Sequence, residues 1–223
     1  FRAEPVGNAG LDVAGDTFDY RIIDEVVSPE LGKGSLYRWM DKTQAMPNHF
    51  YANFAKWHQL ASLKSRDSMA ELNQLLRLSL EPDRIAKFID IIRNDWGFNV
   101  SRAVSDVKIA LSSHSAARFD LRVGDLVIER EITREEYEGW IRDDLARIEQ
   151  TVQRLLDTSG VAPGDIDNVF LTGGSSFIPA VRQIFERQFG EGRLSEGDRF
   201  GSVAAGLALI GLENDIGPWT SRE

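Results

Sequence analysis

A pair of glycines follows a short apolar stretch in the segment VFLTGGSSFIP, residues 169–179. The apolar residues predict a buried strand, and the residues after Gly173 and Gly174 predict the start of a helix. Free backbone N–H groups at a helix start favour an anion, and a residue without a side chain lets a phosphate or a sugar approach the backbone. The same pair is typical of a tight turn in any α/β protein. On these residues alone, both interpretations stay open.

Three polar residues of the segment SDVKIALSS share one face of a predicted helix. Ser105, Lys108 and Ser112 stand at positions i, i+3 and i+7, whereas Val107 and Leu111 point to the opposite side. One ammonium group and two hydroxyls on one face suit a ribose or a phosphate. A solvated face without a ligand explains the same pattern. This helix is therefore a candidate binding face with a purely structural alternative.

Two further segments bring glycine next to a predicted helix. Gly15 precedes a helix start in GLDVAGDTFD, where the helix dipole would favour a phosphate. The segment GSVAAGLALIG predicts a helix of small residues around Gly206, which allows close packing against a neighbouring loop. Close packing explains this second segment without any ligand.

The candidate residues must be positioned by the rest of the chain. It has 223 residues, of which 42% are hydrophobic, and this composition is typical of a globular protein. The length allows one large domain or two small ones. A formal net charge of −9 disfavours a nucleic-acid partner. The chain has no cysteine, which excludes disulfides and thiolate metal sites. Its three histidines are widely spaced, so we expect no metal site. No apolar run approaches the roughly 18 to 20 residues of a membrane span, and no signal-peptide pattern is present. We therefore expect a cytoplasmic protein with no membrane partner.

The first 130 residues predict mostly helix. A helix over 18–27 ends near Pro29 and Gly32, and an aromatic-rich insertion with irregular structure and some helix occupies 30–64. Further helices are predicted over 68–80, 82–95 and 101–113. Alternating apolar residues on both sides of Gly124 then predict a β-hairpin.

The rest of the chain predicts α/β structure. Thr133 and Glu136 form a capping box, and the apolar stripe behind them predicts a single helix of about 24 residues that ends near Gly160. The strand before the glycine pair follows, and then come a helix over 178–189 and the small-residue helix. This order predicts layers of helix and sheet with a second module inserted after the first helix.

Five of these segments together resemble the adenine-nucleotide lobe of the heat-shock protein 70 (DnaK-type) chaperones, a branch of the actin-like ATPases. The segments are AGDTFDYRIID, VKIALSS, ITREEYE, VFLTGGSSFIPAVRQIF and FGSVAAGLA, and their order runs through most of the chain. The forms KIALSS and GDRFGSVAAGLA, with the aromatic-rich insertion, resemble the YegD-like side branch of that family more than DnaK itself.

The resemblance assigns roles to the candidate residues. In that family the two glycines lie against the ribose and phosphates of ATP, which implies that Gly173 and Gly174, with Ser175 beside them, contact ATP or ADP. By the same match, Lys108 and Ser112 contact the ribose.

The chain also departs from the family pattern. The family holds the adenine between two arginines, whose places are taken here by Ile109 and Phe177. The base could stack on the ring of Phe177, or both residues could be buried apolar side chains. Ser105 replaces a ribose-binding glutamate, and Gly15 would lie near the phosphates.

In the actin-like ATPases, glycine-rich loops of the kind DxGxG or DLGGGT begin each lobe and hold the phosphates and Mg²⁺. No such loop is recognised in this sequence, and the resemblance implies that residue 1 follows the end of the second loop. We therefore expect a C-terminal lobe with no catalytic residue and no metal ligand of its own, which binds Mg²⁺ only together with a missing N-terminal lobe and does not hydrolyse ATP alone. The expected partners are that lobe, adenine nucleotide, and a co-chaperone or nucleotide-exchange factor.

The expected fold is α/β, an actin-like ATPase (ribonuclease H-like) lobe. Its sheet-bearing subdomain comprises residues 1–27 and 133–213, its inserted helical subdomain with a hairpin comprises 28–132, and 214–223 form a tail. Two alternatives remain: a protein-interaction module with a vestigial nucleotide site, in which the aromatic insertion forms a partner surface, and a fragment of a kinase with the actin-like fold.

Overall fold

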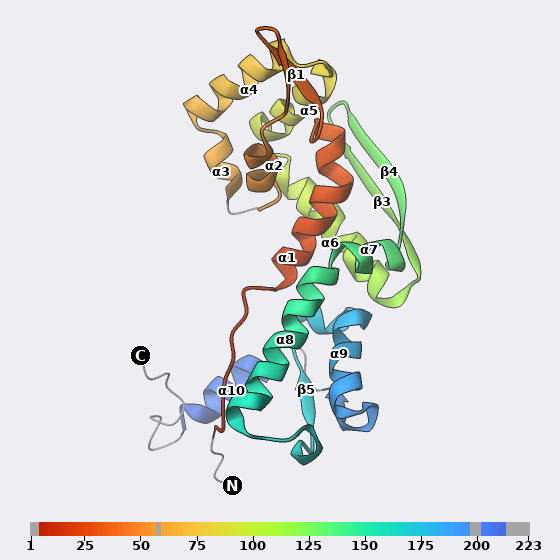
Figure 1. The fold of residues 1–223 in the computed structure, drawn as a ribbon. Coiled ribbons are helices and arrows are strands. Elements are labelled where there is room, and N and C mark those ends of the chain that lie inside the picture. Colours follow the sequence, from red (N-terminus) through yellow and green to blue (C-terminus); the bar gives the residue numbers. More distant parts are fainter. Residues whose placement is uncertain (1–4, 57–58, 197–201, 213–223) are drawn as a thin grey trace. The chain divides into compact units, whose positions relative to one another are not determined.

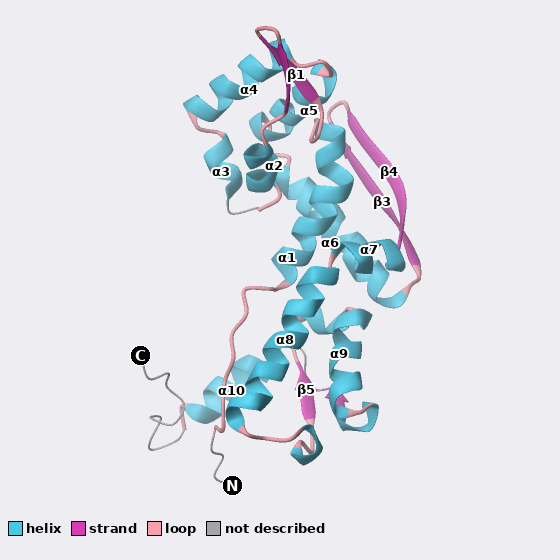
Figure 2. Ribbon diagram, in the orientation of Figure 1, coloured by secondary structure: helices cyan, strands magenta, loops and turns pink. Residues whose placement is uncertain are grey.

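A computed structural model describes residues 5–56, 59–196 and 202–212 (Figure 1). The contacts divide the chain into a first unit, Phe1–Gly15 with Arg142–Glu223, and a second unit, Asp16–Ile141. Both consist of helices with small two-stranded sheets (Figure 2). The subdomain boundaries predicted from the sequence differ from these divisions and stay a prediction. The predicted tail, 214–223, lies outside the described residues.

The second unit begins with an unusual helix. The α-helix α1 (Gly15–Ile22) continues as a π-helical turn over Ile23–Val27 and as a 3₁₀ turn over Ser28–Leu31. This confirms the predicted helix and its end at Gly32, where the backbone enters the left-handed region with φ of 92°. Its apolar side chains are buried, which anchors the element in the core of the second unit.

A hairpin that the sequence did not predict follows, formed by β1 (Leu36–Trp39) and β2 (Lys42–Ala45). Its turn places Met40 at φ of 52°, a conformation that large side chains rarely adopt. Asn-Gly or Asp-Gly would have marked such a turn in the sequence, but Met40 and Asp41 do not.

Helices form the body of the second unit. They are α2 (Asn48–Phe54), α3 (Leu60–Leu63), α4 (Arg66–Leu78), α5 (Pro82–Arg93) and α6 (Gly97–Ser113). Phe88 of α5 is fully buried, stacked on Tyr51 at 5.0 Å between ring centroids and in edge contact with Phe54 at 5.3 Å. Part of the aromatic-rich insertion therefore forms the core of this unit.

The predicted hairpin is confirmed as β3 (Ala116–Val123) and β4 (Leu126–Thr133), antiparallel over eight residue pairs. Phe119, Leu121 and Val123 alternate with exposed residues, as a strand with one buried face requires. A Cβ on Gly124 in the turn would lie 2.4 Å from the ring of Trp96, and the φ of 51° strains any larger residue there, so both features favour glycine.

The long helix predicted from Thr133 to Gly160 is wrong in one respect, because it is two helices, α7 (Arg134–Trp140) and α8 (Arg142–Ser159). Ile141 between them leaves helical geometry with ψ of 6°. Its side chain is fully buried, so the break lets this residue enter the core of the second unit. The apolar stripe continues across the break, which is why periodicity did not reveal it.

The capping box at the start of α7 is confirmed. The Thr133 hydroxyl accepts from the Glu136 N–H at 3.1 Å, and the Glu136 carboxylate accepts from the Thr133 N–H at 2.9 Å. The pKa of Glu136 is lowered from its ordinary 4.5. The main cause is the hydrogen bond that its carboxylate accepts from the Thr133 backbone, and the hydrogen bond from Arg130 is the second cause.

Replacing Glu136 by alanine is expected to lower the free energy of unfolding at neutral pH by about 0.5 to 2 kcal/mol, the range of a capping interaction. Because the pKa of Glu136 is lowered in the folded state, its contribution is complete above pH 4.5 and is lost as the pH falls through the folded-state value. Urea unfolding at pH 7 and pH 3.5 measures the difference. Glu135→Ala removes a neighbouring charge without the box and is the control. Equal losses in the two variants at neutral pH would contradict the role of the box.

The first unit holds a parallel strand pair, β5 (Val169–Leu171) and β6 (Leu194–Glu196), connected through α9 (Pro179–Phe189). Helix α9 packs on α8 and on both strands. The last described helix is α10 (Ser202–Ile210). The close packing expected around Gly206 is not found, because no atom of the described chain lies within 4 Å of a Cβ built there. None of the described helices combines the length and the apolar character that a membrane crossing needs.

Candidate functional site

The glycine pair lies where β5 ends and a 3₁₀ turn over Gly174–Phe177 begins. Gly173 has φ of 80° and ψ of 165°, a region that is essentially restricted to glycine. No described atom lies within 4 Å of a Cβ built on either glycine. The two glycines therefore differ. The backbone conformation at position 173 requires a glycine, whereas the glycine at position 174 only leaves the space beside the backbone unoccupied.

Ser176 fixes the shape of this turn. Its hydroxyl donates to the Gly173 carbonyl at 2.7 Å, and its N–H donates to the same oxygen at 3.1 Å. The side chain is buried. Sequence reasoning placed Ser176 in the turn without a role, although a serine three residues after a glycine is a common source of such a bond. The turn is thus held from inside, and its glycines face open space.

Phe177 is 39% exposed and Ile109 is 65% exposed. The interpretation that both are buried apolar residues is therefore wrong. Phe177 ends the turn, and the next residue, Ile178, enters the core instead. An exposed ring beside an open turn is suited to stack on a planar ligand.

A shallow depression of about 380 Å³ lies beside the turn in the first unit. Ser175 and Ser176 contribute to its wall with the apolar side chains of Leu11, Val13 and Phe170. Phe170 is the most exposed of these, at 66%. The depression brings the glycine turn together with the segment that precedes α1.

The other candidate residues lie on α6 in the second unit. Ser105, Lys108 and Ser112 are half-buried, while Val107 and Leu111 on the other side are buried. The three polar residues therefore share one partly covered face of α6. The hydroxyl of Ser112 donates to the Lys108 carbonyl at 3.1 Å.

Lys108 forms an ion pair with Asp19 of α1, with 2.5 Å between Nζ and Oδ1. Burial raises the pKa of Asp19, and the hydrogen bond and charge of Lys108 oppose this increase. Tyr137 is also buried near Asp19. Its burial is the main cause that raises the pKa of its hydroxyl, and the negative charges of Asp19 and Glu138 raise that pKa further. No local pattern in the sequence indicated the ion pair, because it joins segments that lie far apart along the chain.

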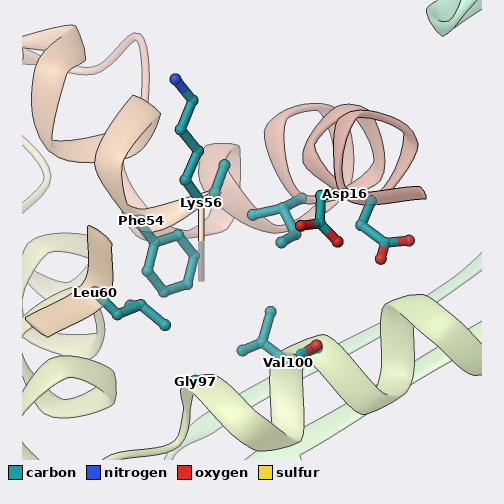
Figure 3. Close-up of a pocket in the computed structure, with 10 residues that line it drawn as sticks. Asp16, Phe54, Lys56, Leu60, Gly97 and Val100 are labelled. Carbon is teal, nitrogen blue, oxygen red and sulfur yellow. The ribbon is translucent and has the colours of Figure 1, made fainter. Parts of the chain in front are cut away.

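A second, deeper cavity of about 40 Å³ lies between α1, α2 and α6 (Figure 3). Phe54, Leu60 and Val100 line it with Asp16 and Lys56, and the ammonium group of Lys56 points away from the cavity. This volume holds a few water molecules and is too small for a nucleotide. No group of three acidic, histidine or cysteine residues that could hold a metal ion occurs in the described part of the chain.

The segment that leads into α1 carries Gly15, the glycine that the resemblance places near the phosphates. Gly15 is the first residue of α1, so the segment forms a loop that leads into a helix.

The candidate residues are thus divided between the units. The first unit holds Gly15, Gly173, Gly174, Ser175 and Phe177, and α6 of the second unit holds Ser105, Lys108, Ile109 and Ser112. Gly173, Gly174, Ser175 and Phe177 lie on one turn, and the α6 residues lie on one helix, whereas Gly15 lies apart from the turn at the start of α1.

Comparison with known proteins gives consistent matches. Residues 84–212 match the family described as Hsp70 protein. A heat shock protein homolog of Eremothecium gossypii is 30% identical over 125 residues, which cover 55% of this chain and 18% of the relative. Its counterparts of the same name from Candida glabrata and Lachancea kluyveri are 28% and 26% identical with the same coverage. The match therefore spans less than a fifth of the length of these relatives.

Proposed function

The chain belongs to the Hsp70 protein family, and from this premise we propose that it is the C-terminal lobe of the nucleotide-binding domain of a DnaK-like chaperone, with an actin-like fold. The lobe supplies contacts to the adenosine and inner phosphates of ATP or ADP. The relatives carry heat-shock names, which supports the chaperone role.

The observation that carries the proposal is the glycine turn with its exposed ring. Gly173 and Gly174 present backbone to open space, because Ser176 holds the turn from inside. Phe177 at its end is exposed, as a residue that stacks on an adenine must be.

The polar face of α6 and the segment before α1 support the same assignment. Ser105, Lys108 and Ser112 offer donors to a ribose, and exposed Ile109 offers an apolar surface to a base. We propose that Gly15, at the start of α1, approaches an inner phosphate.

The lobe alone does not hydrolyse ATP under this proposal. Phosphoryl transfer needs Mg²⁺ and groups that position the attacking water, and the N-terminal lobe would supply the first phosphate loop. The proposed partners are that lobe and a co-chaperone or nucleotide-exchange factor, in a cytoplasmic protein of the YegD-like branch.

One observation favours a protein-interaction module instead. Leu36, Trp39 and Met40 of the β1–β2 hairpin are exposed, and Met40 is held at a positive φ. Exposed apolar groups of this kind mark partner surfaces. However, Phe50, Tyr51 and Phe54 of the same insertion are buried, which leaves the hairpin as the exposed aromatic part among its described residues. No feature of the described chain specifically favours a kinase.

Phe177→Ala in the full-length protein is expected to weaken ATP binding by about 1 to 3 kcal/mol, because a stacking surface for the base is removed. Its stability should change little, since the ring is partly exposed. Calorimetric titration measures the affinity, and thermal unfolding measures the stability.

Trp39→Ala is the control, because it removes another exposed ring, on the β1–β2 hairpin, that is outside the turn and the depression beside it. Equal effects of the two variants on affinity would contradict the stacking role. If Phe177→Ala unfolds the protein, the ring is a core residue and the proposal fails.

A further inference from the structure

The ion pair between Asp19 and Lys108 connects α1 to the candidate face of α6. Nζ of Lys108 and Oδ1 of Asp19 are 2.5 Å apart. The side chain of Asp19 is 26% exposed to solvent, and that of Lys108 is 19% exposed. A pair this well covered is screened less by solvent than the exposed pairs of a protein surface. Its geometry therefore restricts where the ammonium of Lys108 can lie.

The surroundings of Asp19 explain why this pairing is stable. The side chain lies in the wall of the small cavity with the apolar Ile23 and Phe54. The hydroxyl of Tyr137 nearby is buried and has no hydrogen-bond partner among the described residues. A carboxylate in such a place is costly unless a cation compensates it, and Lys108 is the cation in contact with it.

The pairing has a consequence for Lys108. An ammonium group has three donors, and only one is needed for Asp19. The remaining donors can reach a ligand, but the carboxylate at 2.5 Å balances the charge of the group. An ammonium group next to a carboxylate can still donate hydrogen bonds to neutral hydroxyls. Its attraction for a phosphate is weaker than that of an unpaired ammonium group, because the carboxylate repels the phosphate. The neighbouring polar groups, Ser105 and Ser112, are neutral too.

We infer that Asp19 is a positioning residue for Lys108, which fixes the ammonium on the α6 face and balances its charge so that this face selects sugar hydroxyls over phosphate. The inference rests on the proposed function, because that function already assigns the α6 face to the ribose. It adds a residue on α1 that makes no contact with the ligand itself.

The first test needs no nucleotide. Asp19→Asn in the full chain should raise the rate at which an amine-reactive ester modifies Lys108 several-fold, as followed by peptide mass spectrometry. Asp106→Asn is the matched control, since it removes an exposed acid two residues from Lys108 that pairs with Arg102. An unchanged rate in Asp19→Asn would show that the pair does not hold Lys108 and would overturn the inference.

The second test measures selectivity by NMR titration of the full chain with adenosine, 2′,3′-dideoxyadenosine and inorganic pyrophosphate. The unmodified chain and Asp106→Asn should bind adenosine several-fold more tightly than the dideoxy compound. In Asp19→Asn this preference should disappear, and the affinity for pyrophosphate should rise several-fold. Asp19→Glu should restore part of the preference, which a loss of folding would not do.

If Asp19→Asn does not fold, Lys108→Met is the second test variant. It should lose the preference for adenosine without any gain for pyrophosphate, because the ammonium is absent. A preference that survives in Asp19→Asn or in Lys108→Met contradicts the inference. If the unmodified chain binds none of the three compounds, the proposed function fails, while the modification rates still decide whether Asp19 holds Lys108.

Discussion

The purified chain is expected to bind ADP and ATP about a thousandfold more weakly than a micromolar site, and with nearly the same affinity in Mg²⁺ and in chelator. Its proposed contacts, such as Gly173, Gly174 and Lys108, address the adenosine and the inner phosphates. The loss of several charge-assisted hydrogen bonds to the outer phosphates, at about 1.5 to 3 kcal/mol each, moves a micromolar site to the millimolar range.

Calorimetry or NMR with both nucleotides, first with Mg²⁺ and then with chelator, measures this directly. AMP is the control ligand, because a site that recognises only adenosine and an inner phosphate should bind it nearly as well. Tight binding that strictly requires Mg²⁺, or turnover by the purified chain, would show that a complete phosphate site exists and would overturn the half-site proposal.

Phe88→Ala is expected to lower the free energy of unfolding by about 3 to 5 kcal/mol, because it leaves a large cavity in the second unit. Phe88 is fully buried and contacts the rings of Tyr51 and Phe54. Domains of this size are stable by only about 5 to 15 kcal/mol, so the variant loses a large part of that stability. Urea unfolding followed by circular dichroism measures the change.

Phe98→Ala on α6 is the control, since its ring is 76% exposed and should contribute little. A loss below about 1 kcal/mol in Phe88→Ala would mean that the aromatic cluster is not the core of this unit. Comparable losses in the two variants would lead to the same conclusion.

Local signals in the sequence predicted several elements correctly. The capping box at Thr133 and Glu136 depends on residues three apart, and the β3–β4 hairpin depends on alternation around Gly124. Such features are set by neighbours along the chain, so they can be read without knowledge of the fold.

Features set by tertiary packing were missed. The break at Ile141 leaves the apolar period intact, because the residue that interrupts the helix is itself a buried apolar one. The β1–β2 hairpin has Met40 in its turn, where local preference argues against such a conformation. In both places the surrounding structure overrides the local pattern.

The candidate site was predicted in part. The sequence placed Ser105, Lys108 and Ser112 on one face, but periodicity cannot reveal a partner on a distant helix such as Asp19. It left open whether Phe177 is buried, and only the folded chain shows the ring exposed. Exposure and ion pairing depend on what lies opposite each residue, and a single sequence does not contain that information.

The contact between Gly124 and Trp96 couples two positions that lie far apart along the chain. Any larger residue at 124 would overlap the indole ring unless the ring shifts, and the φ of 51° would strain that residue in any case. A smaller side chain at 96 therefore removes the overlap and leaves the backbone strain. Replacing both residues should recover only part of the stability that a substitution at 124 alone would lose.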